Sequence, residues 1–278
     1  MIYLLLAIVS SAAFSLCTRL SSHKIRSPLA MLAVNYLSCL VIAGVRTGAG
    51  NFFPRHEALP QALFWGALQG VFYMVSYLLM QTSIRRNGVV LSATFMKLGL
   101  LVPMAVSIFL FGEFPTVPQL LGFLLAIGAI LLINLDGGQS SIQFRSGLIL
   151  LLLTAGCADT MCKIFEERGN PALDPQFLLY TFMTALLLGV IAMLAKGERP
   201  GKYEIGFGLL VGIPNYCSAK FLLDALEYIP AVITYPSCNV ATILLVTLAG
   251  ILFFREKLSR RQIAAIGIIL VALALLNL

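Results

Sequence analysis

The stretch VPQLLGFLLAIGAILLINL, residues 117–135, contains no charged side chain. It is long enough to cross the hydrocarbon core of a bilayer as a helix, which takes about 20 residues. Nine similar runs occupy most of the remaining chain, separated by short polar gaps and without the alternation typical of barrel strands. The ten predicted spans are Ile2–Leu20, Leu29–Val45, Ala62–Ser83, Val89–Phe111, Val117–Leu135, Gly147–Phe165, Gln176–Ala195, Ile205–Tyr228, Pro230–Phe254 and Ser259–Leu278. The sequence therefore predicts an all-α integral membrane protein with ten transmembrane helices.

The composition supports this fold class. Of the 278 residues, 59% are hydrophobic and 11% are charged, and the mean hydropathy is +0.94. Soluble domains contain about 25% charged residues, so this chain has too few charges to cover a surface that faces water. The net charge of +7 comes from Lys and Arg residues scattered between the apolar runs, which argues against a nucleic-acid partner and for a lipid bilayer.

Basic residues concentrate in alternate gaps. The gaps between the first and second, third and fourth, fifth and sixth, seventh and eighth, and ninth and tenth spans contain most of the Lys and Arg, for example Arg85 and Arg86. The other side has little more than Arg46, Arg55 and Arg168. The positive-inside rule therefore predicts a bacterial cytoplasmic (inner) membrane protein with both termini on the same side, outside.

An internal repeat relates the two halves of the chain. Glu113 in FGE and Glu256 in FRE follow the fourth and ninth spans, 143 positions apart. The same offset relates two further polar pairs, Gln119 with Gln262 and Asn134 with Asn277. We predict two five-helix repeats, residues 1–136 and 145–278, joined by a loop at 137–144. Because each repeat has an odd number of helices, the second is inverted in the membrane, as in many secondary transporters that bind substrate near the midplane.

Glycine pairs and prolines occur inside several of the predicted spans. Gly66 and Gly70 map onto Gly208 and Gly212 with an offset of 142, and we interpret both pairs as points of close helix packing. Three prolines lie inside predicted spans, where each removes a backbone hydrogen bond and favours a kink: Pro103, Pro214 and Pro236. Such kinks are compatible with gating, and they are also common in ordinary membrane helices.

The repeat, the Glu-bearing turns and the closing helix QLLGFLLAIGAILLINL, residues 119–135, resemble the drug/metabolite transporter superfamily of the EamA type. The resemblance implies a ten-helix fold with a central cavity and a role in transport. It leaves the substrate open, because this superfamily carries amino acids, drugs, nucleotide sugars and sugar phosphates. The closing hairpins are also similar to small multidrug resistance proteins, which have an essential Glu in the first helix. The span Ile2–Leu20 has no acid, so that site cannot be transferred to this chain.

Five charged residues inside spans are the main functional candidates. They are Lys97, Asp159, Lys163, Lys220 and Asp224. Each costs about 2.5–3.5 kcal/mol near the bilayer centre, so these groups must be paired, hydrated or close to the surface. The members of each Asp/Lys pair, Asp159 with Lys163 and Lys220 with Asp224, are four residues apart, within reach of an ion pair on one helix face. Lys163 lies near the end of its span beside two glutamates, which favours local neutralisation. Lys220 lies deeper, which favours a cavity role.

Lys97 lies near the middle of the fourth span, with no acid within one turn. In a hydrated cavity it would attract a carboxylate or phosphate, and if desolvated it could bind a proton reversibly. The alternative is an ion pair with an acid of a neighbouring helix, such as Asp159 or Asp224. We predict that Lys97 and Lys220 bind an anionic substrate group, and that the coupling or charge-tuning residues are Asp159, Lys163 and Asp224.

Polar and aromatic residues at helical spacing complete the predicted site. Gln69, Tyr73 and Tyr77 follow one another at intervals of four and share one helix face. Tyrosines can line a cavity and donate hydrogen bonds, although packing explains the same pattern. The further candidates for substrate binding are Asn35, Asn215, Tyr216, Tyr235 and Asn239.

These features predict a secondary active transporter that moves a small metabolite or drug, by efflux or uptake, through alternating access. An anionic substrate and coupling to protons are the expected refinements, with a monomer or homodimer as the assembly. The alternatives are a membrane-embedded enzyme acting on a lipid phosphate and a non-transporting helical partner subunit. The loops lack the acidic clusters that such an enzyme would need for Mg²⁺, so we expect no enzyme activity. The absence of metal and nucleotide motifs predicts no metal and no cofactor.

Overall fold

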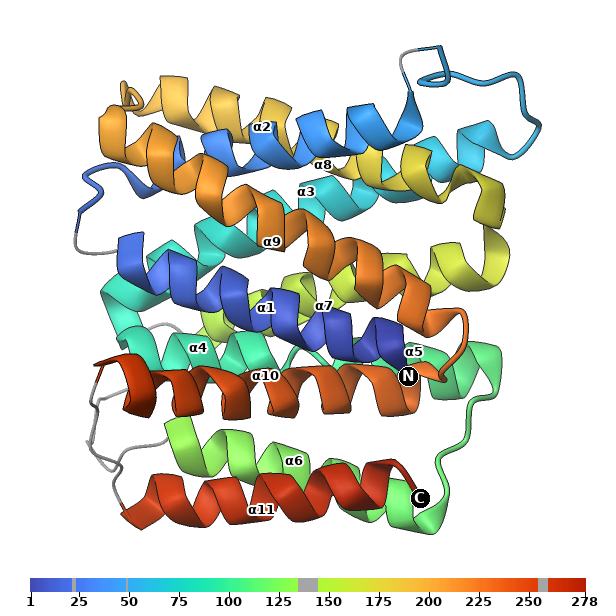
Figure 1. The fold of residues 1–278 in the computed structure, drawn as a ribbon, viewed down its shortest axis with the longest axis vertical. Coiled ribbons are helices and arrows are strands. Elements are labelled where there is room, and N and C mark those ends of the chain that lie inside the picture. The colour runs from blue at the N-terminus through green and yellow to red at the C-terminus, as the bar shows by residue number, and fades with distance from the viewer. Residues whose placement is uncertain (22–23, 49, 135–144, 255–259) are drawn as a thin grey trace. The chain divides into compact units, whose positions relative to one another are not determined.

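The computed structural model describes residues 1–21, 24–48, 50–134, 145–254 and 260–278. Within these ranges the chain forms helices and connecting turns and contains no β-strand (Figure 1). The predicted connecting loop 137–144 lies outside the described residues. The all-helical fold agrees with the prediction from apolar runs.

The helices follow the apolar runs closely, with most ends shifted by a few residues. They are α1 (Ile2–Ser21), α2 (Pro28–Thr47), α3 (Leu59–Asn87), α4 (Val89–Leu98), α5 (Leu101–Phe111), α6 (Val117–Asn134), α7 (Arg145–Arg168), the 3₁₀ turn η1 (Pro171–Leu173), α8 (Asp174–Ala195), α9 (Lys202–Leu226), α10 (Ala231–Phe254) and α11 (Arg260–Leu276). Among the described residues, eight spans are long and apolar enough to cross a membrane, and Val117–Leu132 and Ile263–Leu276 are two shorter apolar helices. Together they supply the ten predicted segments, so the chain is an integral membrane protein.

The predicted span Val89–Phe111 is confirmed as an apolar segment, and within it the helix is interrupted between α4 and α5. Pro103 has no N–H to donate to the carbonyl of Gly99, four residues earlier. That carbonyl instead accepts a hydrogen bond from Val102 N at 3.0 Å, and the amide of Gly99 bonds to the carbonyl of Met96 at 3.1 Å. These three-residue steps tighten the chain and end α4 at Leu98. By contrast, α9 and α10 continue through Pro214 and Pro236.

The chain forms two compact units, and each takes helices from both halves of the sequence. Unit 1 consists of Met1, Val75–Thr160 and Leu226–Leu278, and unit 2 consists of Ile2–Met74 and Met161–Ala225. In unit 1, α6 and α11 lie side by side (Figure 1). In unit 2, α2 lies beside α8 (Figure 1). The rings of Phe165 and Phe177 stack at 4.1 Å between centroids in the core of unit 2.

The glycine pairs allow close helix packing in unit 2, as predicted. A Cβ on Gly66 of α3 would lie 2.6 Å from the carbonyl oxygen of Phe177 in α8. A Cβ on Gly208 of α9 would lie 2.6 Å from the Cβ of Val34 in α2. Both distances are too short for a real side chain, so glycine is required for these helices to pack at this distance.

Candidate functional site

Lys97 and Asn239 connect α4 with α10 in unit 1. The Nζ of Lys97 donates a hydrogen bond to Oδ1 of Asn239 at 3.3 Å, and both side chains are half-buried. The two residues are 142 positions apart, the offset that also relates Gly66 to Gly208. Position 97 lies between Gly70, where the offset is 142, and Glu113, where it is 143, so the repeat counterpart of Lys97 is Asn239 or its neighbour Val240. The hydrogen bond therefore joins corresponding regions of the two repeats, and inverted-repeat transporters bind substrate where their repeats meet.

Asp159 of α7 is brought close to Lys97 by two glycines. A Cβ on Gly99 would lie 3.0 Å from the backbone nitrogen of Gly156, so the end of α4 contacts α7 backbone to backbone. Lys97 precedes Gly99 by two residues, and Asp159 follows Gly156 by three. The two charged groups are consequently close enough to interact electrostatically. Of the two predicted interhelical partners of Lys97, the one that shares unit 1 with it is Asp159.

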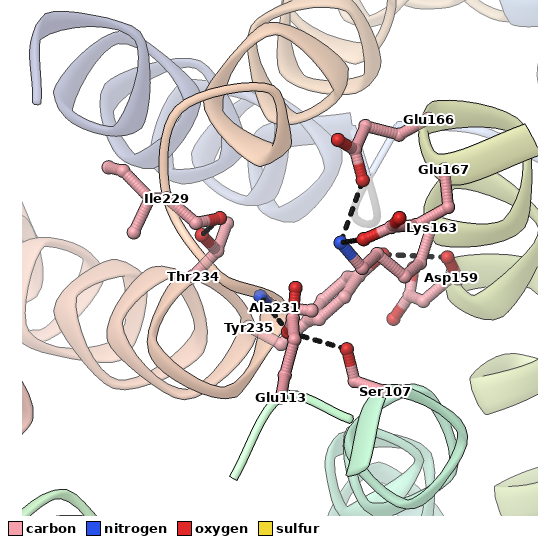
Figure 2. A network of polar contacts seen from close by, with 10 residues as sticks. All are labelled: Ser107, Glu113, Asp159, Lys163, Glu166, Glu167, Ile229, Ala231, Thr234 and Tyr235. Atoms are coloured by element: carbon pink, nitrogen blue, oxygen red, sulfur yellow. Dashed lines mark hydrogen bonds and ion pairs between the residues drawn. The ribbon is translucent and has the colours of Figure 1, made fainter. Parts of the chain in front are cut away.

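Tyr235 fixes the backbone of α7 at this point. Its hydroxyl donates a hydrogen bond to the carbonyl oxygen of Asp159 at 2.7 Å, and the tyrosine is only 1% exposed (Figure 2). Asn239, one turn further along α10, donates its amide to the carbonyl of Tyr235 at 3.1 Å. Within the described part of the chain, the carboxylate of Asp159 receives no hydrogen bond. The site in unit 1 therefore contains a positioned aspartate with unused acceptor capacity.

Unit 2 contains a second charged pair, Lys220 and Asp224 of α9. Their side chains form an ion pair and are 17% and 12% exposed. Tyr216, one turn before Lys220, is buried, and its ring lies 5.9 Å from that of Phe182. Arg46 of α2 also interacts electrostatically with Tyr216. The predicted span ends at Val45, which leaves Arg46 in a loop, but α2 extends to Thr47 and therefore contains this arginine in its last turn.

The predicted stripe Gln69, Tyr73 and Tyr77 does not form a single surface. Gln69 is completely buried and fully hydrogen-bonded, because its amide donates to Tyr73 Oη at 3.4 Å and to Cys162 Sγ at 2.8 Å, and it accepts from Thr181 Oγ1 at 2.9 Å. These bonds join α3 to α7 and α8, so we assign Gln69 a structural role in unit 2.

The other tyrosines of the stripe have separate surroundings. The half-buried Tyr73 lies in unit 2, where its ring is 6.5 Å from that of Phe182. Tyr77 belongs to unit 1 and accepts a hydrogen bond from the amide of Gln81 at 2.8 Å. Both tyrosines are half-buried.

The predicted asparagines of unit 2 bond to each other. Asn215 of α9 donates its amide to Oδ1 of Asn35 in α2 at 3.2 Å, and Asn35 is 1% exposed. One turn away in α9, the hydroxyls of Ser218 and Ser11 are 2.6 Å apart. Serines are common in membrane helices, so no sequence pattern predicts this bond between α1 and α9. The four residues form a polar layer that ties α1 and α2 to α9.

Lys163 is neutralised by its own helix. Its Nζ lies 2.7 Å from Glu166 and 2.6 Å from Glu167, and the lysine is 1% exposed (Figure 2). Two carboxylates therefore surround this ammonium group near the end of α7. We accordingly treat Lys163 as a structural residue of unit 2.

Glu113 of the FGE turn caps a helix in unit 1. Its Oε2 accepts hydrogen bonds from Ser107 Oγ at 2.6 Å and from the backbone nitrogen of Ala231 at 2.7 Å (Figure 2). Ala231 is the first residue of α10, where backbone N–H groups lack partners and the helix dipole favours a negative charge. The FGE turn therefore holds the start of the helix that carries Tyr235 and Asn239.

Comparison with known proteins places these features in a family. The model of the EamA-like transporter family matches residues 1–135 and again residues 145–278. An uncharacterized protein of Haemophilus influenzae is 25% identical over 190 residues, which cover 66% of this chain and 65% of that protein. A crystal structure superposes with a TM-score of 0.75 over 99% of this chain and 94% of that one, at 14% identity. The likeness to the crystal structure shows the fold alone.

Proposed function

The chain belongs to the EamA-like transporter family, and we propose that it is a secondary transporter that moves a small anionic or zwitterionic solute across the membrane by alternating access. The observation that carries the proposal is the hydrogen bond between Lys97 and Asn239. This bond supports the proposal because it joins a cationic side chain of the first repeat to a polar side chain of the second, and inverted-repeat transporters bind solute where the repeats meet.

Lys97 is suited to bind an anionic group. An ammonium group has three N–H donors, and within the described residues Lys97 uses one of them, toward the neutral amide of Asn239. The start of α5 lies four residues further along and adds the partial positive charge of a helix N-terminus. A carboxylate or phosphate oxygen at this position would satisfy donors that the protein leaves open.

Asp159 would balance the charge of Lys97 when the site is empty. A lone lysine in the hydrocarbon region is costly, and a nearby carboxylate lowers this cost. When an anionic solute binds to Lys97, Asp159 is left with an unfavourable like charge beside it. Uptake of a proton by Asp159 would remove that repulsion, which gives a direct route to coupling between solute and proton.

Unit 2 contains further candidates for solute binding. Its half-buried Tyr73 and Asn215 and the pair Lys220 and Asp224 are polar groups in membrane helices, where such groups usually serve function. Asn35, Tyr216 and Gln69 of the same unit are buried, so their proposed role is to position these polar groups.

The proposal is tested by a thermal-shift screen of the purified protein in detergent. Amino acids, organic acids, sugar phosphates and cationic drugs are added to wild type, Lys97→Ala and the control Lys196→Ala, whose lysine is exposed at the end of α8. A ligand stabilises by RT ln(1 + [L]/Kd), so millimolar concentrations reveal even weak binding. We expect an anionic or zwitterionic solute to stabilise wild type and Lys196→Ala but not Lys97→Ala. Equal stabilisation of all three proteins would remove Lys97 from the binding site.

A further inference from the structure

Unit 2 contains a cavity whose lining includes none of the residues assigned to transport. It has a volume of about 500 Å³ and lies between the end of α2, the start of α8 and the loop after α2. Its lining includes Leu40, Val41, Gly44, Phe52, Tyr180 and Met183. Ligand cavities in proteins typically measure about 300–1,000 Å³, so this cavity is large enough for a substantial apolar group.

The cavity is preformed and apolar. The hydroxyl of Tyr180 donates a hydrogen bond to the carbonyl of Phe52 at 2.6 Å, so its one lining side-chain hydroxyl is already used. Tyr180 also stacks on Phe53 with 5.8 Å between ring centroids, which holds the loop over the cavity. Gly44 has no side chain, which keeps this part of the cavity open. A Cβ at this position would lie 3.6 Å from the ring of Phe52, at ordinary van der Waals distance. A polar solute would find no free side-chain partner among these residues.

The rim of the cavity faces the lipid side. Val41 and Val45 of α2 are 57% and 79% exposed, and Met183 of α8 is 41% exposed. Both helices are membrane spans, so exposed apolar side chains on them contact hydrocarbon. From Leu40 to Gly48 the cavity extends along about 12 Å of the last turns of α2 and reaches the end of the helix. It therefore opens laterally to the outer part of one leaflet, just below the headgroups.

A positive charge lies in the loop that covers the cavity. Arg55 follows the lining residue Phe53 by two positions, is exposed, and forms no ion pair within the described residues. A phospholipid combines an acyl chain, which matches the apolar cavity, with a phosphate, which matches an arginine. We propose that a phospholipid of the surrounding bilayer binds here, with an acyl chain in the cavity and its phosphate at the loop near Arg55.

Such a lipid would fasten together three segments of unit 2 that meet at the cavity. This inference does not depend on the proposed transport function, since none of the cavity residues belongs to the proposed solute site. The cavity-filling variant Gly44→Leu tests it, because a longer side chain at position 44 projects into the volume that the acyl chain would occupy. Gly206→Leu is the matched control: Gly206 is an exposed helical glycine of unit 2 with open space around its Cβ position.

The experiment is native mass spectrometry of the full-length protein, released from detergent after mixing with phosphatidylglycerol. We expect wild type and Gly206→Leu to retain one phospholipid at collision energies that strip the bulk lipid, and Gly44→Leu to lose it. Arg55→Gln should retain less phosphatidylglycerol than wild type while an uncharged single-chain detergent binds equally to both. Equal lipid retention by Gly44→Leu and Gly206→Leu, or none by wild type, would overturn the proposal. Misfolding could also remove lipid, so Gly44→Ala serves as a second variant. Its Cβ fits at van der Waals distance from Phe52, and we expect this variant to stay folded and to keep the lipid.

Discussion

Gly99 and Gly156 bring the backbones of α4 and α7 into contact, with the Cβ position of Gly99 only 3.0 Å from the backbone nitrogen of Gly156. The electrostatic interaction of Lys97 with Asp159 follows from this contact, because each charged residue lies within one turn of its glycine. Two residues without side chains thus determine how closely Lys97 and Asp159 approach each other.

Replacing Gly156 by Val should damage the site without changing its charges. The new Cβ would lie 2.6 Å from the Cβ of Val102, so α4 and α7 must separate. Overpacking of this kind costs about 1–3 kcal/mol, and the nearest atom is the backbone carbonyl oxygen of Gly99, which has little freedom to move, so we expect the upper part of that range. Thermal unfolding in detergent measures the loss, and binding of the solute found in the screen should weaken in parallel.

The control for this prediction is Gly128→Val in α6, also in unit 1. Gly128 is exposed and has open space around its Cβ position, so the variant should unfold within about 0.5 kcal/mol of wild type. If both valine variants behave alike, close packing at Gly156 is not what positions the charges.

Glu113→Ala should destabilise unit 1. The variant leaves the N–H of Ala231 and the hydroxyl of Ser107 without their charged acceptor. Hydrogen bonds to charged groups contribute about 1.5–3 kcal/mol each at most, and we expect a total loss of about 2 kcal/mol. Glu113→Gln keeps an acceptor oxygen and should lose about half as much. Glu227→Ala, an exposed acid shortly before α10, provides the comparison in unfolding measurements and should have little effect.

Lys163→Met should destabilise the protein without abolishing solute binding. It leaves Glu166 and Glu167 beside each other without the ammonium group that now lies within 2.7 Å of both. Removal of one partner from a buried ion pair costs about 3–5 kcal/mol. Adding Glu166→Gln and Glu167→Gln to this variant should recover much of the stability, since the unpaired charges are then gone. A folded Lys163→Met protein that fails to bind solute would instead place Lys163 in the binding site.

The charge bias predicts that both chain ends lie outside the cytoplasm. Alkaline phosphatase fused after Leu278 should therefore be active, because that enzyme folds only on the outer side of the cytoplasmic membrane. A fusion after Arg199, in a gap rich in basic residues, should be inactive. The reverse pattern would mean that the positive-inside rule fails for this chain.

The sequence predicts the fold well because the bilayer imposes a simple requirement: each crossing needs about 20 apolar residues with all backbone groups bonded. It predicts helix neighbours less well. Membrane helices are apolar toward lipid as well as toward protein, so hydropathy does not show that Gln69 is buried or that Tyr77 belongs to another unit than Tyr73. The break after Leu98 depends on how Pro103 and Gly99 act together, and apolar patterning is insensitive to it.

The composition of the two units has a consequence for biosynthesis. Unit 2 needs Ile2–Met74 and Met161–Ala225, so its first helices enter the bilayer long before their partners are translated. Unit 1 likewise remains incomplete until residues after Leu226 have been made. Neither unit can therefore assemble from the first half of the chain alone. Until the second half is made, the inserted helices hold polar residues such as Asn35 and Lys97 in the membrane without their partners. Translation that stops late in the chain would therefore leave an incompletely assembled, aggregation-prone protein in the bilayer.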